Sequence, residues 1–248
     1  MDVVGQNSLA DLTFMQEQTD GFNARPPVSI YGSYGVDYIG WEKIPEPFRS
    51  NLSSTARDQL AAFPADWPEA EYEVASVITS DIPGDYSGYG TFVVINVAPL
   101  SRGTVTIDSS SMEDPPIINP NWNTAQTDKE VFLQAVKRAR QILSSAALAP
   151  IRLGTEYTPG DGVQTDAELE EYIQNNLFMN WHAACTCKMG MVNDAMAVVD
   201  SRARVIGVNN LRVVDASSFA LLPPGHPTST VYGLAEKISA DIIRTHQM

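Results

Sequence analysis

Runs of apolar and β-branched residues predict extended strands in the first half of the chain. The segments 71–79 (EYEVASVIT) and 90–100 (GTFVVINVAPL) are β-branched and partly alternate between apolar and polar positions. Residues 101–108 (SRGTVTID) continue the pattern, with a turn at Arg102-Gly103. Residues 114–122 (DPPIINPNW) contain too many prolines for a central strand. Two further short strands are expected within 197–217, around a turn at Gly207.

Helical periodicity follows two copies of a capping motif. Thr127-Asp-Lys-Glu130 and Thr165-Asp-Ala-Glu168 each place Glu three residues after Thr, the spacing of a capping box. The first box precedes an apolar stripe at spacings of three and four: Val131, Phe132, Ala135, Val136, Ala139, Ile142 and Leu143. A short helix with a serine cap is expected at 53–63, and a last helix after Pro227.

This mixture predicts an α+β fold whose last strand and helix dock on another part of the protein. The chain of 248 residues is long enough for one large domain or two small ones. Its net charge of −14 argues against nucleic acid or a membrane surface as partners. The chain has no apolar run of about 20 residues, its start does not resemble a signal peptide, and it contains two cysteines. The expected compartment is therefore the cytoplasm.

Two segments that each contain a histidine are candidates for a catalytic site. The stretch 181–190 (WHAACTCKMG) places His182 between an aromatic residue and small residues, which let the backbone approach a flat ligand. His226 sits in Pro-Pro-Gly-His-Pro, just before the last helix, whose free amides favour negative charge. The alternatives are a buried structural histidine for His182 and an incidental loop residue for His226. We expect the two imidazoles to meet at one acid/base site.

The two cysteines lie next to His182, at 185 and 187. With His182 they would give three metal ligands, whereas structural zinc takes four. A redox pair would instead have the Cys-x-x-Cys spacing. We therefore predict no metal and two reduced thiols that pack as small apolar groups.

These blocks together resemble the C-terminal half of the glucose–methanol–choline (GMC) flavin oxidoreductases, in their fungal form. The resemblance spans about residues 70–245, and the blocks that carry it are Pro99–Gly103, Asp114–Pro120, His182–Gly190, Val198–Asp200, Gly207–Ser217 and Pro223–Thr228. It implies three consecutive segments. The first is a loop-rich start at 1–70, and the second, at 71–180, is an antiparallel substrate-binding sheet with helices packed on one side. The third, at 181–248, is a catalytic segment that carries a remnant strand and the C-terminal helix of the flavin domain.

The resemblance also implies roles for individual residues. His182 would take the proton of an alcohol while a hydride passes to FAD, and His226 would orient the hydroxyl. The FAD would lie against Asp215, Ala216, Pro227 and Thr228. Separately from the resemblance, we predict a hydrophobic substrate pocket lined by Trp181, Cys185, Tyr31 and Tyr34. It would accept an apolar or aromatic alcohol or a polyketide-like substrate. The sequence departs from the family at Ala183, where Pro is common, and at Cys185, where a small residue is usual.

The family's glycine-rich FAD-binding unit has no counterpart among these residues. The nearest string, Gly88-Tyr-Gly90, lacks the third glycine and precedes a strand. We therefore expect FAD to bind this chain weakly or not at all. Three hypotheses follow: a portion of an alcohol oxidoreductase that needs an FAD-binding partner half, a free-standing protein catalysing a non-redox cyclisation, dehydration or isomerisation, or a non-catalytic binding module. Surface left bare by the missing half would also favour a homodimer.

The two histidines argue against the non-catalytic module, and the segment beginning at Asp215 favours the oxidoreductase portion, because a redox-free protein has no evident need for it. The initiating Met1 and the apparently complete C-terminus favour the free-standing protein.

Overall fold

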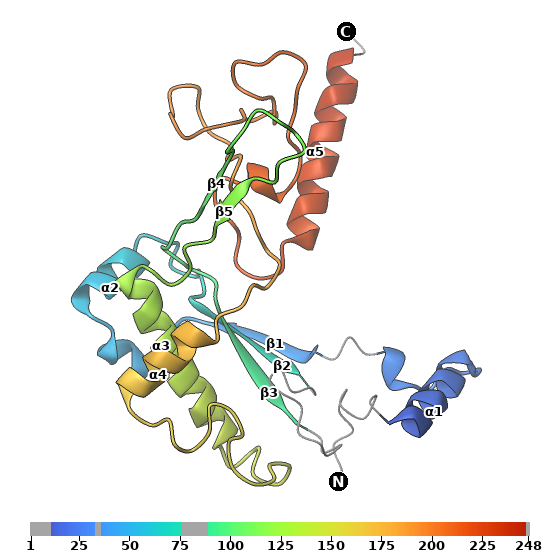
Figure 1. Ribbon diagram of the computed structural model, residues 1–248, viewed down its shortest axis with the longest axis vertical. Coiled ribbons are helices and arrows are strands. Elements are labelled where there is room, and N and C mark those ends of the chain that lie inside the picture. Colours follow the sequence, from blue (N-terminus) through green and yellow to red (C-terminus); the bar gives the residue numbers. More distant parts are fainter. Residues whose placement is uncertain (1–10, 33–35, 76–88, 247–248) are drawn as a thin grey trace. The chain divides into compact units, whose positions relative to one another are not determined.

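The computed structural model describes residues 11–32, 36–75 and 89–246 (Figure 1). Helices and small antiparallel sheets alternate along them, so the predicted α+β fold is confirmed. The helices are α1 (Leu12–Asn23), α2 (Ser54–Leu60), α3 (Gln126–Leu143), α4 (Asp166–Asn175) and α5 (Thr228–His246). The strands are β1 (Val36–Glu42), β2 (Ala70–Ala75), β3 (Thr91–Asn96), β4 (Thr104–Thr106) and β5 (Ile117–Asn119).

The chain divides into two compact units. Unit 1 comprises the described parts of Met1–Pro99 and Ala125–Asn176, and unit 2 those of Leu100–Thr124 and Leu177–Met248. The units interleave along the sequence, because the chain enters unit 2 for the β4–β5 hairpin and then returns to unit 1 for α3 and α4. The consecutive division into 1–70, 71–180 and 181–248 stays a prediction.

Unit 1 is built on an antiparallel sheet with the order β1–β2–β3. Helix α3 packs against β2 and β3, while α2 and α4 pack against α3 (Figure 1). The apolar stripe predicted for α3 is partly confirmed, since Val131, Ala135 and Ala139 are buried. The core that these elements share consists of Ile44, Leu52, Ala56, Leu60, Ala70, Tyr72, Ala98, Val131, Ala135 and Ala139.

Of the two predicted capping boxes, one forms. Thr165 caps α4 and accepts from the backbone N–H of Glu168, whose carboxylate accepts from the Thr165 N–H in return. The box at Thr127 is wrong, because α3 already begins at Gln126. The Thr127 hydroxyl instead donates to Gln59 of α2, and Glu130 accepts from the N–H of Ser53, the residue that caps α2 as predicted. The Thr127 hydroxyl and the Glu130 carboxylate therefore bond to α2 and its cap instead of to each other's backbone.

Unit 2 holds less regular structure than its sequence suggests. The strands β4 and β5 pair with each other, and all their residues are exposed. The two strands predicted within 197–217 are wrong, since that stretch contains isolated bridges, Val199 with Val205 and Arg204 with Arg212, between tight turns. Among the described residues of unit 2, the buried apolar ones are Val199, Ala203, Phe219 and Ile238.

Helix α1 was not predicted from the sequence. Asp11 caps it by accepting from the N–H groups of Thr13 and Phe14, and the helix packs against the short 3-10 turn at Ile30–Gly32. Among the described residues no helix has the length and apolar character needed to cross a bilayer.

A buried carboxylate holds the loop between β1 and α2 to the sheet. Glu69 is 1% exposed, and its side chain accepts from the Ile44 N–H at 2.9 Å and from Arg49 Nη1 at 2.7 Å. Removing Arg49 would leave a buried charge with part of its compensation lost.

We therefore predict that Arg49→Met lowers the free energy of unfolding by about 2–3 kcal/mol. The matched control is Arg138→Met, which breaks the ion pair with Glu42. Both side chains of that pair are more than a quarter exposed, so the loss should stay below about 1 kcal/mol. Denaturant unfolding of the two variants measures the difference, and equal losses would contradict the role given to Glu69.

Candidate active site

Three backbone hydrogen bonds tie the segment after His182 to the segment before His226. In each, an N–H of residues 185–189 donates to a carbonyl of residues 216–218. The pairs are Cys185 to Ala216 at 3.1 Å, Cys187 to Ser217 at 2.8 Å, and Met189 to Ser218 at 2.9 Å. Two stretches distant in sequence therefore run side by side, which fixes where each histidine loop begins.

The imidazoles of His182 and His226 meet in unit 2. Their ring centroids lie 4.9 Å apart with an interplanar angle of 80°, an edge-to-face arrangement. His182 is half-buried and His226 is exposed, so solvent or a ligand can reach the pair. The buried Gly225 precedes His226 with a φ of 89°, a backbone conformation that favours glycine. The geometry places two groups able to accept or donate a proton beside one point.

The four residues expected to face FAD lie in the same unit. Asp215 is exposed, and its carboxylate accepts from the Ser217 N–H at 2.8 Å, which caps the short 3-10 turn Ala216–Ser218. Helix α5 begins at Thr228, and its first-turn hydrogen bond runs from the Val231 N–H to the Pro227 carbonyl. The N–H groups of the first turn have no acceptor within a helix, so they favour a negatively charged or electron-rich group. This donor set fits the edge of a flavin ring.

Two of the predicted pocket residues have unusual backbone conformations. Trp181 has φ 53° and is 77% exposed, and Cys185 has φ 68° and is half-buried. A non-glycine residue in this left-handed region costs on the order of 1 kcal/mol or more. Burial raises the pKa of the Cys185 thiol, while the charge of Arg102 and the N–H of Leu222 act in the opposite direction.

The two tyrosines are not brought to this site by any described contact. Tyr31 belongs to unit 1, where its ring packs edge-on against Phe22 and its hydroxyl donates to the Met15 carbonyl at 3.3 Å. Tyr34 lies outside the described residues. Their part in a substrate pocket stays a prediction.

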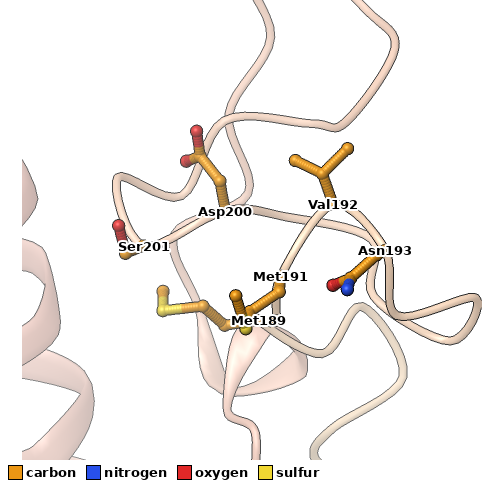
Figure 2. Close-up of a pocket in the computed structure, with 7 residues that line it drawn as sticks. Met189, Met191, Val192, Asn193, Asp200 and Ser201 are labelled. Atoms are coloured by element: carbon orange, nitrogen blue, oxygen red, sulfur yellow. The ribbon is translucent and has the colours of Figure 1, made fainter.

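A second feature of unit 2 was not predicted from the sequence. A pocket of about 630 Å³ has a mainly apolar lining, which consists of Met189, Gly190, Met191, Val192, Asn193, Asp200 and Ser201. Figure 2 shows the side chains of six of these residues, Met189, Met191, Val192, Asn193, Asp200 and Ser201. Gly190 is required here, because a Cβ atom would lie 2.8 Å from the side chain of Ala197. The apolar residues within Met189–Val192 were the only sequence signal for this pocket. Periodicity does not reveal whether the apolar side chains of a loop are buried or exposed.

Comparison with models of protein families shows to which family this chain belongs. The family model described as GMC oxidoreductase matches residues 99–235, which include both histidines. The chain belongs to the GMC oxidoreductase family.

Two fungal proteins match most of the chain. Patulin synthase from Aspergillus clavatus is 46% identical over 98% of the chain, and versicolorin B synthase stcN from Emericella nidulans is 42% identical over 84%. The chain covers 40% and 32% of these two proteins, so it spans well under half the length of the relatives it matches. An FAD-dependent oxidoreductase from Chaetomium thermophilum shares the fold, with a TM-score of 0.79 at 24% identity over 98% of this chain and 45% of that one.

The raised pKa of Cys185 makes a prediction about its charge. In a Cys187→Ser variant of this GMC chain, the midpoint of the thiolate absorbance titration should lie above the ordinary thiol pKa of 9.0. The folded state then holds the thiol proton of Cys185 more tightly than the unfolded state does. The contribution of this thiol to the free energy of unfolding is therefore complete below pH 9.0. It is lost as the pH rises from 9.0 through the pKa of the folded protein. A double variant that also carries Cys185→Ser should lose this pH dependence. Titration at or below 9.0 would contradict the burial.

Proposed function

We propose that this chain is the catalytic portion of a GMC oxidoreductase that oxidises an alcohol group of a fungal secondary metabolite. His182 and His226 form its acid–base pair, and the single observation that carries the proposal is their edge-to-face approach at 4.9 Å. The family match and the fungal relatives named as synthases support the substrate class.

Each histidine has a distinct task. The substrate hydroxyl lies against both rings, where His226 hydrogen-bonds its oxygen and His182 takes its proton. The carbinol C–H bond breaks as a hydride leaves, so the alcohol becomes an aldehyde or ketone. FAD, when bound, would supply the two-electron acceptor for that hydride. A positioned base of this kind typically contributes about 10²–10⁴-fold to the rate.

The residues that would lie against the flavin ring are Asp215, Ala216, Pro227 and Thr228. The first turn of α5 favours negative charge that develops there. Holding the pyrophosphate needs a glycine-rich turn at a helix N-terminus, which the 248 residues do not contain. The chain therefore works with an FAD-binding half as its partner.

The exposure of apolar side chains in unit 2 supports a partner that covers them. Unit 2 buries few apolar residues among those described, whereas unit 1 has a core shared by several elements. Many of its large apolar side chains are about half or more exposed, including Met191, Val192, Met196, Val208, Leu211 and Tyr232. Exposed apolar surface of this kind marks an interaction site. A homodimer would cover the same surface only against the repulsion of two chains of charge −14.

A second candidate is a proton-transfer reaction without FAD, such as a cyclisation, dehydration or isomerisation. The observation that favours it is that two relatives carry names that describe synthesis rather than oxidation. The same two imidazoles would act as base and acid, since general acid–base catalysis needs no flavin.

The test compares His182→Gln, His226→Gln and the control His246→Gln in protein joined to an FAD-binding half. We expect His182→Gln to slow the loss of the flavin's visible absorbance on mixing with an alcohol by about 10²–10⁴-fold, His226→Gln to slow it less, and the control to leave it unchanged.

If the alcohol reduces the flavin of the His182→Gln variant as fast as that of the unsubstituted protein, the role of His182 as the base is contradicted. Turnover by a colourless chain would instead establish the second candidate, and loss of that turnover in His182→Gln would show that the same imidazole carries it.

A further inference from the structure

Cys185 carries a side chain although its backbone adopts a conformation that favours glycine. Its φ of 68° lies in the left-handed region, which costs a residue other than glycine on the order of 1 kcal/mol or more. Strain of this kind persists where the surrounding structure enforces it, and it gathers at functional sites. We therefore expect the side chain of Cys185 to make a contact that glycine could not make.

The sulfur of Cys185 links the segment of one candidate histidine to the segment of the other. It accepts from the backbone N–H of Leu222, while the N–H of Cys185 donates to the Ala216 carbonyl at 3.1 Å. Cys185 lies three residues after His182, and Leu222 lies four residues before His226. The two segments thus touch at the sulfur and again at the imidazole rings, whose centroids are 4.9 Å apart.

The loop between the sulfur contact and His226 is short and stiff. Pro223 and Pro224 have fixed φ angles and no N–H group, so Leu222 carries the last backbone donor before Gly225. Gly225 is buried and has a φ of 89°. Anchoring the Leu222 N–H therefore limits where the imidazole of His226 can lie.

We propose that Cys185 is a positioning residue whose sulfur holds the loop from Leu222 to His226, so that the imidazole of His226 meets that of His182. This inference rests on the proposed function, since it names a residue that sets the geometry of the same acid–base pair.

The protonation state of the thiol fits a positioning role. Burial raises the pKa of the Cys185 thiol despite the nearby charge of Arg102, so the thiol stays protonated near neutral pH. A protonated thiol is a poor nucleophile, yet its sulfur remains a weak hydrogen-bond acceptor. Cys185 thus acts on the proton transfer through the His226 loop and not by reacting with the substrate.

Three substitutions separate the sulfur contact from the backbone strain. Cys185→Ala removes the acceptor and keeps the strain, Cys185→Gly removes both, and Cys185→Ser keeps an acceptor at the same backbone position. The matched control is Asn210→Ala, because Asn210 has a φ of 61° at an exposed turn of the same unit.

The first readout is the nuclear Overhauser cross-peak between the ring protons of His182 and His226 in the 248-residue chain. We expect Cys185→Ala and Cys185→Gly to lose most of its intensity, because the His226 loop is no longer anchored. Cys185→Ser and Asn210→Ala should retain it.

The second readout is alcohol oxidation by protein joined to an FAD-binding half. Cys185→Ala and Cys185→Gly should each lower kcat by about tenfold with KM nearly unchanged, because misplacing a catalytic group slows the chemical step. Cys185→Ser should recover most of the loss. Denaturant unfolding should show Cys185→Gly to be at least as stable as Cys185→Ala, since glycine relieves the strain. A purely structural role would instead make the loss of kcat follow the loss of stability.

The two proposals fail in different ways. If Cys185→Ala and Cys185→Gly keep both the cross-peak and kcat, or if Cys185→Ser behaves like Cys185→Ala, the role of the sulfur is overturned while the proposed function stands. If the unsubstituted protein oxidises no alcohol, the proposed function falls. The cross-peaks of the variants then still decide whether Cys185 sets the contact between the two rings.

Discussion

The site depends on the three backbone hydrogen bonds between residues 185–189 and 216–218. They hold together two segments of unit 2 that contain little regular secondary structure. One segment starts just after His182, and the other leads through a rigid proline-flanked loop to His226 and the N-terminus of α5. Breaking these bonds would release both histidine loops at once. The chemistry proposed here is thus a consequence of a backbone register rather than of side-chain packing.

The two units are stabilised to different degrees. Unit 1 has a sheet, helices packed on it and a shared core, with Glu69 securing the loop beside the sheet. Unit 2 carries the candidate histidine pair but buries little apolar surface, and exposed apolar side chains such as Met191 and Val192 line its pocket. The proposed FAD-binding half would cover part of this exposed surface, and the chain spans well under half of the length of its relatives.

The sequence predicted elements whose signals are local. The capping box at Thr165, the serine cap of α2 and the buried positions of α3 needed only spacing and residue type. The box at Thr127 failed because α2 competes for its groups, which no local pattern records. The strands expected within 197–217 failed because β-branched composition does not distinguish a strand from a run of turns joined by single bridges.

The meeting of His182 and His226 followed from a motif resemblance, which carries information from other proteins about long-range contacts. Periodicity alone could not have brought together residues so far apart in sequence.

The most direct measurement of the central claim is the nuclear Overhauser effect between histidine ring protons in the folded chain. With rings in edge-to-face contact at 4.9 Å, the account predicts a cross-peak between His182 and His226 that disappears in a His226→Gln variant. A spectrum of the folded protein in which both rings are assigned and no such cross-peak exists would contradict it.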